Sequence, residues 1–277
     1  MPNRHPWLHC PPAHPQIEAI PALRDNYFWL IAGPDAHSAA VVDPGEAAPV
    51  QAALAAHNYS LGAILLTHHH GDHVGGVAEL AQQWQCEVFG PAGETIAGVS
   101  SPVSAGSTVA PAGIGTSFEV IDVPGHTSGH IAYFASRHGT DRRPVLFCGD
   151  TLFAGGCGRI FEGTPEQLLA SLERLAALPE DTLVYCAHEY TVSNLRFALA
   201  AEPGSAELVA RSDEAVRMQA AGIATVPTNI AIERATNPFL RCDQVSIRDT
   251  VATRLGRPPV SRIETFTELR AWKNQFA

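Results

Sequence analysis

The strongest constraint on this 277-residue chain is the stretch THHHGDHVGG at residues 67–76. It holds four histidines and one aspartate within six positions, 68–73, directly after the apolar run 61–66. The apolar run predicts a buried strand, and the spacing of apolar residues from 74 onward predicts a helix. Ends of strands that lead into loops are where α/β proteins place their chemistry. One histidine there is usually structural, but four with an acid predict a metal site.

The spacing within this turn suggests two groups of ligands. His68 and His70 are two residues apart, so their side chains point the same way in an extended backbone, whereas His69 points the other way and is not expected to be a ligand. Asp72 and His73 follow at the start of the predicted helix. One turn can therefore direct two pairs of ligands at two nearby points.

Further ligands are needed, because a catalytic metal takes three protein ligands and keeps an open position. Three candidates follow apolar runs at the same kind of junction as the histidine-rich turn. They are His126 in VPGHTSGH, Asp150 at the end of VLFCGD and His188 at the end of TLVYCAH. A single polar residue at a strand end is weak support for function, but together these three make a consistent second half of a metal site.

The rest of the chain divides into an α/β part and a helical part. From about residue 17 to 188, short β-rich runs alternate with helical patterns. The helix predicted over 164–178 starts with Thr164 as cap, Pro165 in the first position and Gln167 three residues after the cap. After residue 190 we expect helices only. We therefore predict a loose tail over 1–16, a metal-binding α/β domain over 17–190 and a small helical domain over 191–277.

Composition excludes several classes of protein. The net charge of −10 argues against nucleic-acid binding, which usually needs a basic patch. No apolar run approaches the ~20 residues of a membrane span, and residues 1–16 lack the continuous apolar stretch of a secretory signal. The six cysteines are scattered without a C-x-x-C pair, which indicates reduced thiols. We expect a cytoplasmic monomer that binds neither nucleic acid nor membrane.

The motifs also carry a family resemblance. The H-x-H-x-D-H core at 68–73 resembles the metal signature of the metallo-β-lactamase superfamily. The chain resembles more specifically the glyoxalase II (hydroxyacylglutathione hydrolase) family, from about residue 17 to the end, through DNYFWLI, VVDPGE, PGHTSGHI, FCGDTLFAGGCGRIFEGTPEQ, YCAHEYTVSNLRFA and ERATNPFLR. The resemblance implies an αββα sandwich with metals at the sheet edges, followed by a small helical domain.

The resemblance also implies a ligand set and a reaction. His68, His70 and His126 would hold a first metal, Asp72, His73 and His188 a second, and Asp150 would bridge both. Zinc is the metal usually named for the family, with iron or manganese as alternatives, and imidazole-rich sites suit such cations. Two metals can share a hydroxide that attacks a thioester carbonyl. The implied reaction is hydrolysis of S-(2-hydroxyacyl)glutathione, such as S-D-lactoylglutathione, to D-lactate and glutathione, with Asp72 and Asp150 as catalytic carboxylates.

Glutathione is anionic, so a protein of this charge must place cations locally. The resemblance points to Arg159, Phe161, Tyr190, Arg270 and Lys273 as substrate contacts. Arg270 and Lys273 are three residues apart on a predicted helix and share a face, and Lys273 is the only lysine. Three residues depart from patterns seen in the family: Arg159 where lysine occurs, Phe161 where tyrosine occurs, and Gly71 where bulkier residues are common.

Two other functions stay open. The first is a different reaction of the superfamily: persulfide oxidation at one iron, or hydrolysis of a lactone or β-lactam. The complete second ligand set argues against a one-iron oxygenase, and the missing export signal argues against a periplasmic β-lactamase. The second is a non-catalytic metal- or glutathione-binding module. Cys157 is expected to be structural, since no histidine is paired with it.

Overall fold

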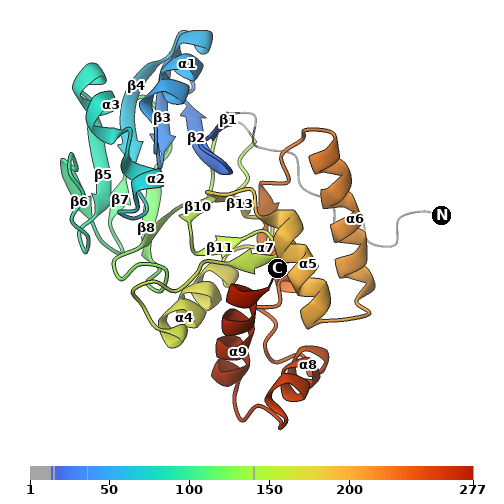
Figure 1. Cartoon of the computed structure of the whole chain (residues 1–277). Helices are drawn as coiled ribbons and strands as arrows, with labels where there is room; N and C mark the ends of the chain where they lie inside the picture. Colours follow the sequence, from blue (N-terminus) through green and yellow to red (C-terminus); the bar gives the residue numbers. More distant parts are fainter. Residues whose placement is uncertain (1–13, 15, 36, 140, 277) are drawn as a thin grey trace.

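The computed structural model describes residues 14, 16–35, 37–139 and 141–276. Two six-stranded sheets face each other and form the body of the molecule (Figure 1). The first sheet has the order β1 (Ile17–Ala22), β2 (Asn26–Ala32), β3 (Ser38–Val42), β4 (Ser60–Leu65), β5 (Glu87–Pro91), β6 (Ser101–Val103). The second has the order β14 (Thr228–Asn229), β13 (Leu183–Cys186), β10 (Val145–Gly149), β9 (Ile131–Ala135), β8 (Phe118–Asp122), β7 (Thr108–Val109).

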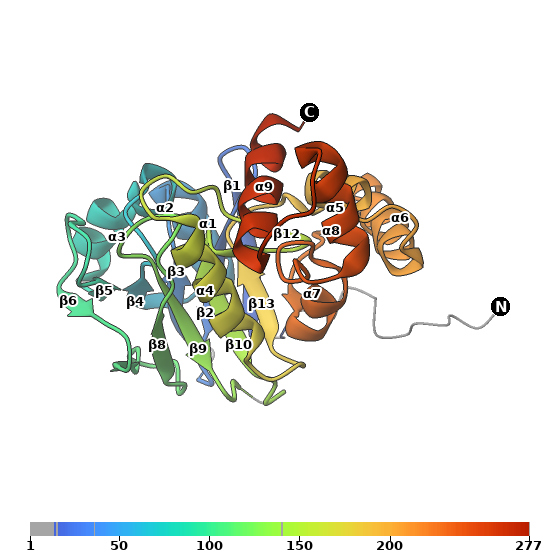
Figure 2. The same ribbon diagram turned by 90° about the horizontal axis from the view of Figure 1, so that it is seen from below.

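Helices cover both outer faces of this sandwich. The helices α1 (Ala47–His57) and α3 (Val77–Trp84) pack on the first sheet, and α4 (Pro165–Ala176) packs on the second (Figures 1 and 2). Strand β2 illustrates the reason for this arrangement: Trp29 and Ile31 point into the core between the sheets, whereas Phe28 and Leu30 point into the core beneath α1 and α3. Because successive side chains of a strand alternate, a strand that is apolar throughout must be covered on both faces. The predicted αββα sandwich is confirmed.

The carboxyl ends of the central strands meet at one edge of the sandwich. Strand β4 runs parallel to β3 and β5, and β10 runs parallel to β13. Parallel neighbours end at the same edge of a sheet, so the residues after β3 and β4 lie together, as do those after β10 and β13. The histidine-rich turn follows β4 and continues into the short helix α2 (Gly71–Val74).

The single helix predicted from residue 74 is wrong in detail, because the structure has two helices, α2 and α3, separated at Gly75 and Gly76. A Cβ on Gly75 would lie 2.4 Å from the carbonyl oxygen of Gly45, and a Cβ on Gly76 would lie 2.6 Å from the nitrogen of Ala47. The break therefore occurs where the turn packs directly against the backbone that leads into α1. Only glycine allows this approach.

The C-terminal part forms a group of helices beside the sandwich (Figure 2). They are α5 (Thr191–Ala201), α6 (Ala206–Ala220), α7 (Ile230–Thr236), α8 (Val245–Leu255) and α9 (Arg262–Gln275). The expectation that strands stop after residue 190 is wrong, because β14 pairs antiparallel with β13, with Leu183 opposite Asn229. A two-residue strand and the seven-residue α7 are too short to leave a periodic pattern.

The predicted start of α4 is confirmed, whereas two predictions about the division of the chain stay open. Thr164 and Gln167 form the predicted capping box at the start of α4, with Pro165 in the first turn. Among the described residues, no helix is long and apolar enough to cross a membrane. The predicted tail over 1–16 falls outside the described residues except for 14 and 16, and the division at 190/191 stays a prediction.

Candidate metal centre

The seven predicted ligands converge at the edge of the sandwich, on two adjoining positions. At the first position, His70 Nδ1 lies 3.1 Å from His68 Nε2 and 3.0 Å from His126 Nε2. His126 Nε2 is also 3.3 Å from one carboxylate oxygen, Oδ2, of Asp150. Three imidazoles from two loops and one carboxylate oxygen thus surround a common point.

The second position uses the other oxygen of Asp150. Its Oδ1 lies 3.6 Å from His73 Nε2 and 3.3 Å from His188 Nε2. Asp72 Oδ2 lies 3.4 Å from His73 Nε2 and 3.6 Å from His188 Nε2. Asp150 therefore lies between the two positions, with one oxygen toward each.

These separations fit metal coordination. Ligand atoms held 2.0–2.1 Å from a tetrahedral zinc lie about 3.3 Å from one another. His73 Nε2 and Asp150 Oδ1 are buried and have no hydrogen-bond partner in the described part of the chain. A buried polar atom without a partner is costly, and a cation would satisfy both atoms. The donor set of imidazoles and carboxylates therefore fits a pair of divalent cations.

Three of the ligand histidines have an oxygen partner at Nδ1 that directs Nε2 toward the site. The Nδ1–H of His73 donates to Asp43 over 3.1 Å, and the Nδ1–H of His188 donates to Asp25 over 2.9 Å. The Nδ1–H of His126 donates to the carbonyl oxygen of Arg159 over 2.7 Å. A proton on Nδ1 leaves the lone pair on Nε2, which is the atom that faces the site.

Two further side chains support the ligands. His130 is buried and stacks on His68, with ring centroids 4.6 Å apart, and its Nε2 accepts a hydrogen bond from the backbone nitrogen of Asp150 over 3.1 Å. Asn26 donates to Asp72 Oδ2 over 3.1 Å. Sequence reasoning did not assign these residues, nor Asp25 and Asp43. All four lie within or beside strand-end motifs, which is the signal that could have identified them.

Burial and charge divide the histidines into two kinds. Burial lowers the pKa of His68, His70 and His126, so these rings are neutral and able to bind a cation near pH 7. Burial lowers the pKa of His73 and His188 too, but their carboxylate neighbours together outweigh it and raise the pKa of both: Asp150 at each, with Asp43 and Asp72 at His73 and Asp25 at His188.

The two carboxylates are ionised. The neighbouring imidazole of His73 holds the pKa of Asp72 well below its usual range. Burial opposes ionisation of Asp150, yet the neighbouring His73 and His188 lower its pKa strongly. The site thus offers two negative charges to a cation at neutral pH.

His69 has different surroundings. Its Nδ1 bonds to Glu94 over 2.8 Å, and its Nε2 lies 3.1 Å from Glu162. His69, His70 and Glu162 also come close enough to one another to be counted as a possible cation group. The two carboxylates account for both nitrogens of His69, so its exclusion from the ligand set stays the prediction.

The predicted substrate contacts surround the site unequally. Phe161 is 60% exposed, and its ring packs edge-on against His70 at 5.5 Å between centroids. Tyr190 stacks on His188 at 4.7 Å between centroids. Arg159 is exposed, whereas Arg270 is buried, and its guanidinium donates to the carbonyl oxygen of Cys157 over 2.8 Å.

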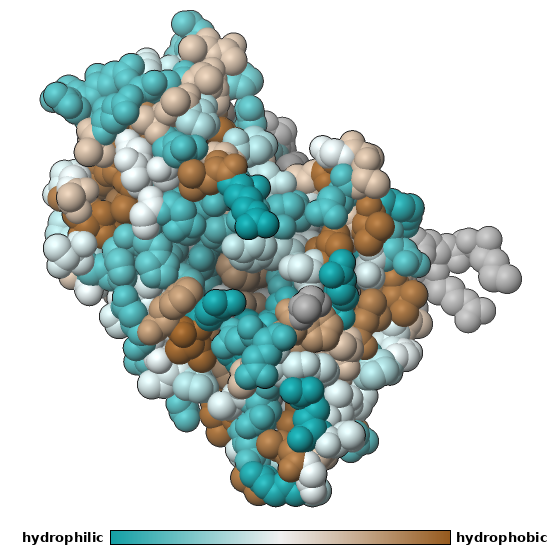
Figure 3. All heavy atoms as spheres, in the orientation of Figure 1, coloured by the Kyte–Doolittle hydropathy of each residue, from teal (hydrophilic) through white to brown (hydrophobic). Residues whose placement is uncertain are grey.

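A group of cations lies beside the metal centre. Burial, together with the nearby charges of Arg270, Arg196 and Arg159, lowers the pKa of Lys273 to about 8. Sequence reasoning missed Arg196, which is exposed on α5. Four cations so close together in a chain of net charge −10 favour an anionic ligand. On the face shown in Figure 3, hydrophilic residues dominate the central region.

Cys157 is buried, and burial raises the pKa of its thiol. A thiol in that state is a poor nucleophile. Its sulfur lies 3.5 Å from the Arg270 guanidinium, and its backbone belongs to the hairpin between Asp150 and Arg159. These surroundings agree with the structural role expected for it.

Comparison with known proteins first gives the class. The model of the metallo-beta-lactamase superfamily matches residues 23–188. The crystal structure of BLEG-1 B3 metallo-beta-lactamase has the same fold, with a TM-score of 0.60 and 24% identity over 81% of this chain and 99% of that one.

The particular family follows from the remaining matches. A model described as hydroxyacylglutathione hydrolase C-terminus matches residues 189–276. The chain is 51% identical over 268 residues to the hydroxyacylglutathione hydrolase of Cupriavidus metallidurans, covering 94% of this chain and 99% of that protein. It is 52% identical over 262 residues to that of Pseudomonas aeruginosa, with the same coverage. The chain belongs to the hydroxyacylglutathione hydrolase family.

Proposed function

We propose that the protein hydrolyses the thioester of S-(2-hydroxyacyl)glutathione, such as S-D-lactoylglutathione, to D-lactate and glutathione. The observation that carries the proposal is the convergence of seven side chains on two positions that share Asp150. The family membership of the chain supports the choice of a glutathione thioester over other acyl compounds.

The metal we favour is zinc, with iron or manganese as alternatives. Five imidazoles and two carboxylates suit these cations better than Ca²⁺ or Mg²⁺, which prefer oxygen ligands. Such a pair of cations supplies Lewis acidity and lowers the pKa of a coordinated water to about 7. In this proposal His68, His70 and His126 hold one cation, and Asp72, His73 and His188 hold the other.

The chain's own residues orient this chemistry. Asp150 spans both positions, because its two oxygens face different histidines. Asp43, Asp25 and the carbonyl of Arg159 keep the imidazole lone pairs aimed at the cations. Preorganised ligands of this kind avoid the cost of rearrangement during reaction.

We assign recognition of the glutathione portion to Arg159, Phe161, Tyr190, Arg270 and Lys273. The proposal is supported by the position of Phe161 and Tyr190 against ligand histidines and by the cations around Lys273. The guanidinium of Arg270 donates to backbone carbonyl oxygens at 157–158. We therefore propose that Arg270 holds this loop in place as well as attracting the charge of the substrate. Most of these groups come from or contact residues 191–277, in keeping with the proposed substrate-binding domain.

The protein is further proposed to act as a cytoplasmic monomer. The five described cysteines are free thiols, as a reducing compartment predicts. Light scattering of the purified protein tests the monomer, and a folded protein of twice the chain mass would contradict it.

The decisive experiment combines elemental analysis with a thioester assay. We expect close to two divalent metals per chain and hydrolysis of S-D-lactoylglutathione that a chelator abolishes. Asp150→Asn should lower kcat at least about 100-fold, beyond the usual effect of removing a ligand's supporting contact. Asp141→Asn, at a half-buried carboxylate that pairs with Arg143 away from the proposed ligands, is the matched control.

Two outcomes would contradict the proposal. Metal-loaded protein without thioesterase activity would refute it outright. About one iron per chain, with oxygen uptake on a persulfide substrate, would instead favour the alternative reaction of the superfamily.

A further inference from the structure

The hairpin between Asp150 and Arg159 stands apart from the two large sheets. It consists of β11 (Leu152–Phe153) and β12 (Gly156–Cys157), which within the described part of the chain pair only with each other. Two-stranded ribbons are marginally stable alone. The hairpin nevertheless begins two residues after the bridging ligand and ends two residues before the carbonyl that orients His126.

The two ends of this hairpin are close together at the metal centre. The backbone nitrogen of Gly158 donates to the carbonyl oxygen of Thr151 over 3.1 Å. A Cβ on Gly158 would lie only 1.9 Å from the carbonyl oxygen of Asp150. A shift of the hairpin would therefore move the backbone of Asp150 and the carbonyl of Arg159 together.

Side chains from the C-terminal helices bind the backbone of the hairpin from outside. Asn237, which follows α7, donates to the carbonyl oxygens of Gly156 over 2.8 Å and Phe153 over 3.3 Å. Glu233 on α7 accepts from the backbone nitrogen of Gly155 over 2.9 Å. Asn194 on α5 donates to the carbonyl oxygen of Ala154 over 3.2 Å.

Glu233 is the centre of this network. It is completely buried, and every partner donates to it. Its Oε2 accepts from Gly155 and, over 2.9 Å, from Asn237, while its Oε1 accepts from Thr228 over 2.7 Å and from the guanidinium of Arg211. The charge of Glu233 thus offsets a buried arginine on α6.

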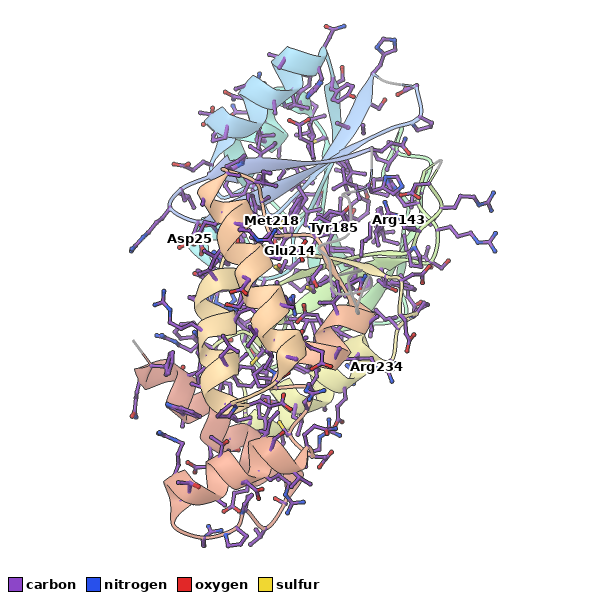
Figure 4. All side chains as sticks on the ribbon, turned by 90° about the vertical axis from the view of Figure 1, so that its right-hand side faces the viewer. Asp25, Arg143, Tyr185, Glu214, Met218 and Arg234 are labelled. Carbon is purple, nitrogen blue, oxygen red and sulfur yellow. The ribbon has the colours of Figure 1, made fainter. Side chains whose placement is uncertain are left out.

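Through Arg211, the hydrogen bonds around Glu233 extend to helix α6. Arg211 lines a small cavity of about 20 Å³ together with Glu214 and Met218, which are labelled in Figure 4. Arg234, next to Glu233 along the chain, has a side chain 53% exposed and pairs with Glu180 at the surface. The two neighbouring residues of α7 therefore hold a buried and an exposed ion pair, which makes them a matched pair for experiment.

We propose that Glu233 and Asn237 are positioning residues for the metal centre, and this inference rests on the proposed function. They hold the β11–β12 hairpin against the C-terminal helices, and so set the backbone of Asp150 and the carbonyl that orients His126. The hairpin also contacts the site through Phe153, whose ring lies 5.9 Å from that of His188. The C-terminal helices thus shape the metal centre as well as flanking it.

Glu233→Gln tests the inference with almost no change in shape. A glutamine has one acceptor oxygen and one amide group, so either the Gly155 and Asn237 side or the Arg211 and Thr228 side loses its acceptor. We expect the holoenzyme to lose metal at a chelator concentration about 10–100-fold lower, with a similar fall in kcat and little change in KM. The d–d spectrum of the cobalt-substituted protein should change as well.

Two further variants separate positioning from stability. Glu180→Gln removes the exposed partner of Arg234 and should leave chelator resistance, spectrum and kcat unchanged. The double variant Arg211→Gln/Glu233→Gln also removes the buried positive charge. The side-chain oxygen introduced at position 233 is then no longer needed by Arg211 and can accept from Gly155. Chelator resistance should therefore recover. If Glu233→Gln does not fold, Asn237→Ala replaces it, since it removes the bonds to Phe153 and Gly156 while the carboxylate stays.

The outcomes distinguish this inference from the proposed function. A folded Glu233→Gln or Asn237→Ala protein with wild-type metal retention and spectrum, even with a lower melting temperature, would overturn the positioning role. A wild-type protein that retains two metals but hydrolyses no thioester would overturn the proposed function, and chelator resistance of the variants would still decide the positioning role.

Discussion

Asp43→Asn tests whether the second metal position depends on a carboxylate outside the proposed ligand set. The side chain of Asp43 is 3% exposed, and each of its contacts is a donor. One oxygen accepts from the backbone nitrogen of Thr67 over 2.8 Å. The other accepts from the hydroxyl of Thr67 over 2.7 Å and from His73 Nδ1 over 3.1 Å.

Asparagine cannot serve all three donors. If the amide NH₂ of the asparagine faces the backbone N–H of Thr67, two donors face each other, and this buried N–H loses its acceptor. If its amide group faces His73, the ring must accept at Nδ1 and carry its proton on Nε2, the atom aimed at the cation. A hydrogen bond to a charged group contributes about 1.5–3 kcal/mol, which corresponds to roughly a 10–100-fold change in affinity.

The measurement is a competition titration of the holoenzyme with a chelator, followed by kcat of the reloaded protein. We expect one of the two cations to bind about 10–100-fold more weakly in Asp43→Asn. Asp35→Asn is the control, because Asp35 accepts hydrogen bonds in an exposed turn from His37 and Ser38. Wild-type affinity for both cations together with full turnover would show that the orienting argument is wrong.

Three further predictions concern recognition and stability. The pKa of Lys273 is lowered to about 8, so its ammonium is charged below that pH, and KM for an anionic thioester should rise as pH passes about 8. Lys273→Arg should flatten this rise, whereas a flat wild-type profile would exclude Lys273 as an anion contact. Phe161→Tyr adds a hydroxyl at an exposed site and should lower KM up to about tenfold with little change in kcat; an unchanged KM would contradict this. Thr164→Ala removes the hydroxyl that accepts from the Gln167 nitrogen and should lower the free energy of unfolding by about 1 kcal/mol, seen as a lower urea midpoint with unchanged kcat.

More of the candidate metal centre than of the proposed substrate site could be predicted from the sequence. The ligands of the centre lie at ends of apolar runs, and the carboxyl ends of parallel strands meet at one edge, so their convergence could be predicted. The proposed substrate contacts lie on an exposed loop and on helices, and no comparable rule predicts how these helices pack. Arg270 illustrates the difference: its place on a helix face was predictable, but its burial against Cys157 depends on how α9 packs.

By itself, the sequence determined the local features: which segments become strands or helices, where α4 begins, and which turn concentrates imidazoles. Those features follow from alternating burial, cap hydrogen bonds and spacing within a few residues. Only the tertiary structure decided the partners: Asp43 for His73, Asp25 for His188, Glu233 for Gly155, and the pairing of β14 with β13. The physical reason is that such contacts join groups far apart along the chain, and their geometry exists only after the two sheets and the C-terminal helices have packed.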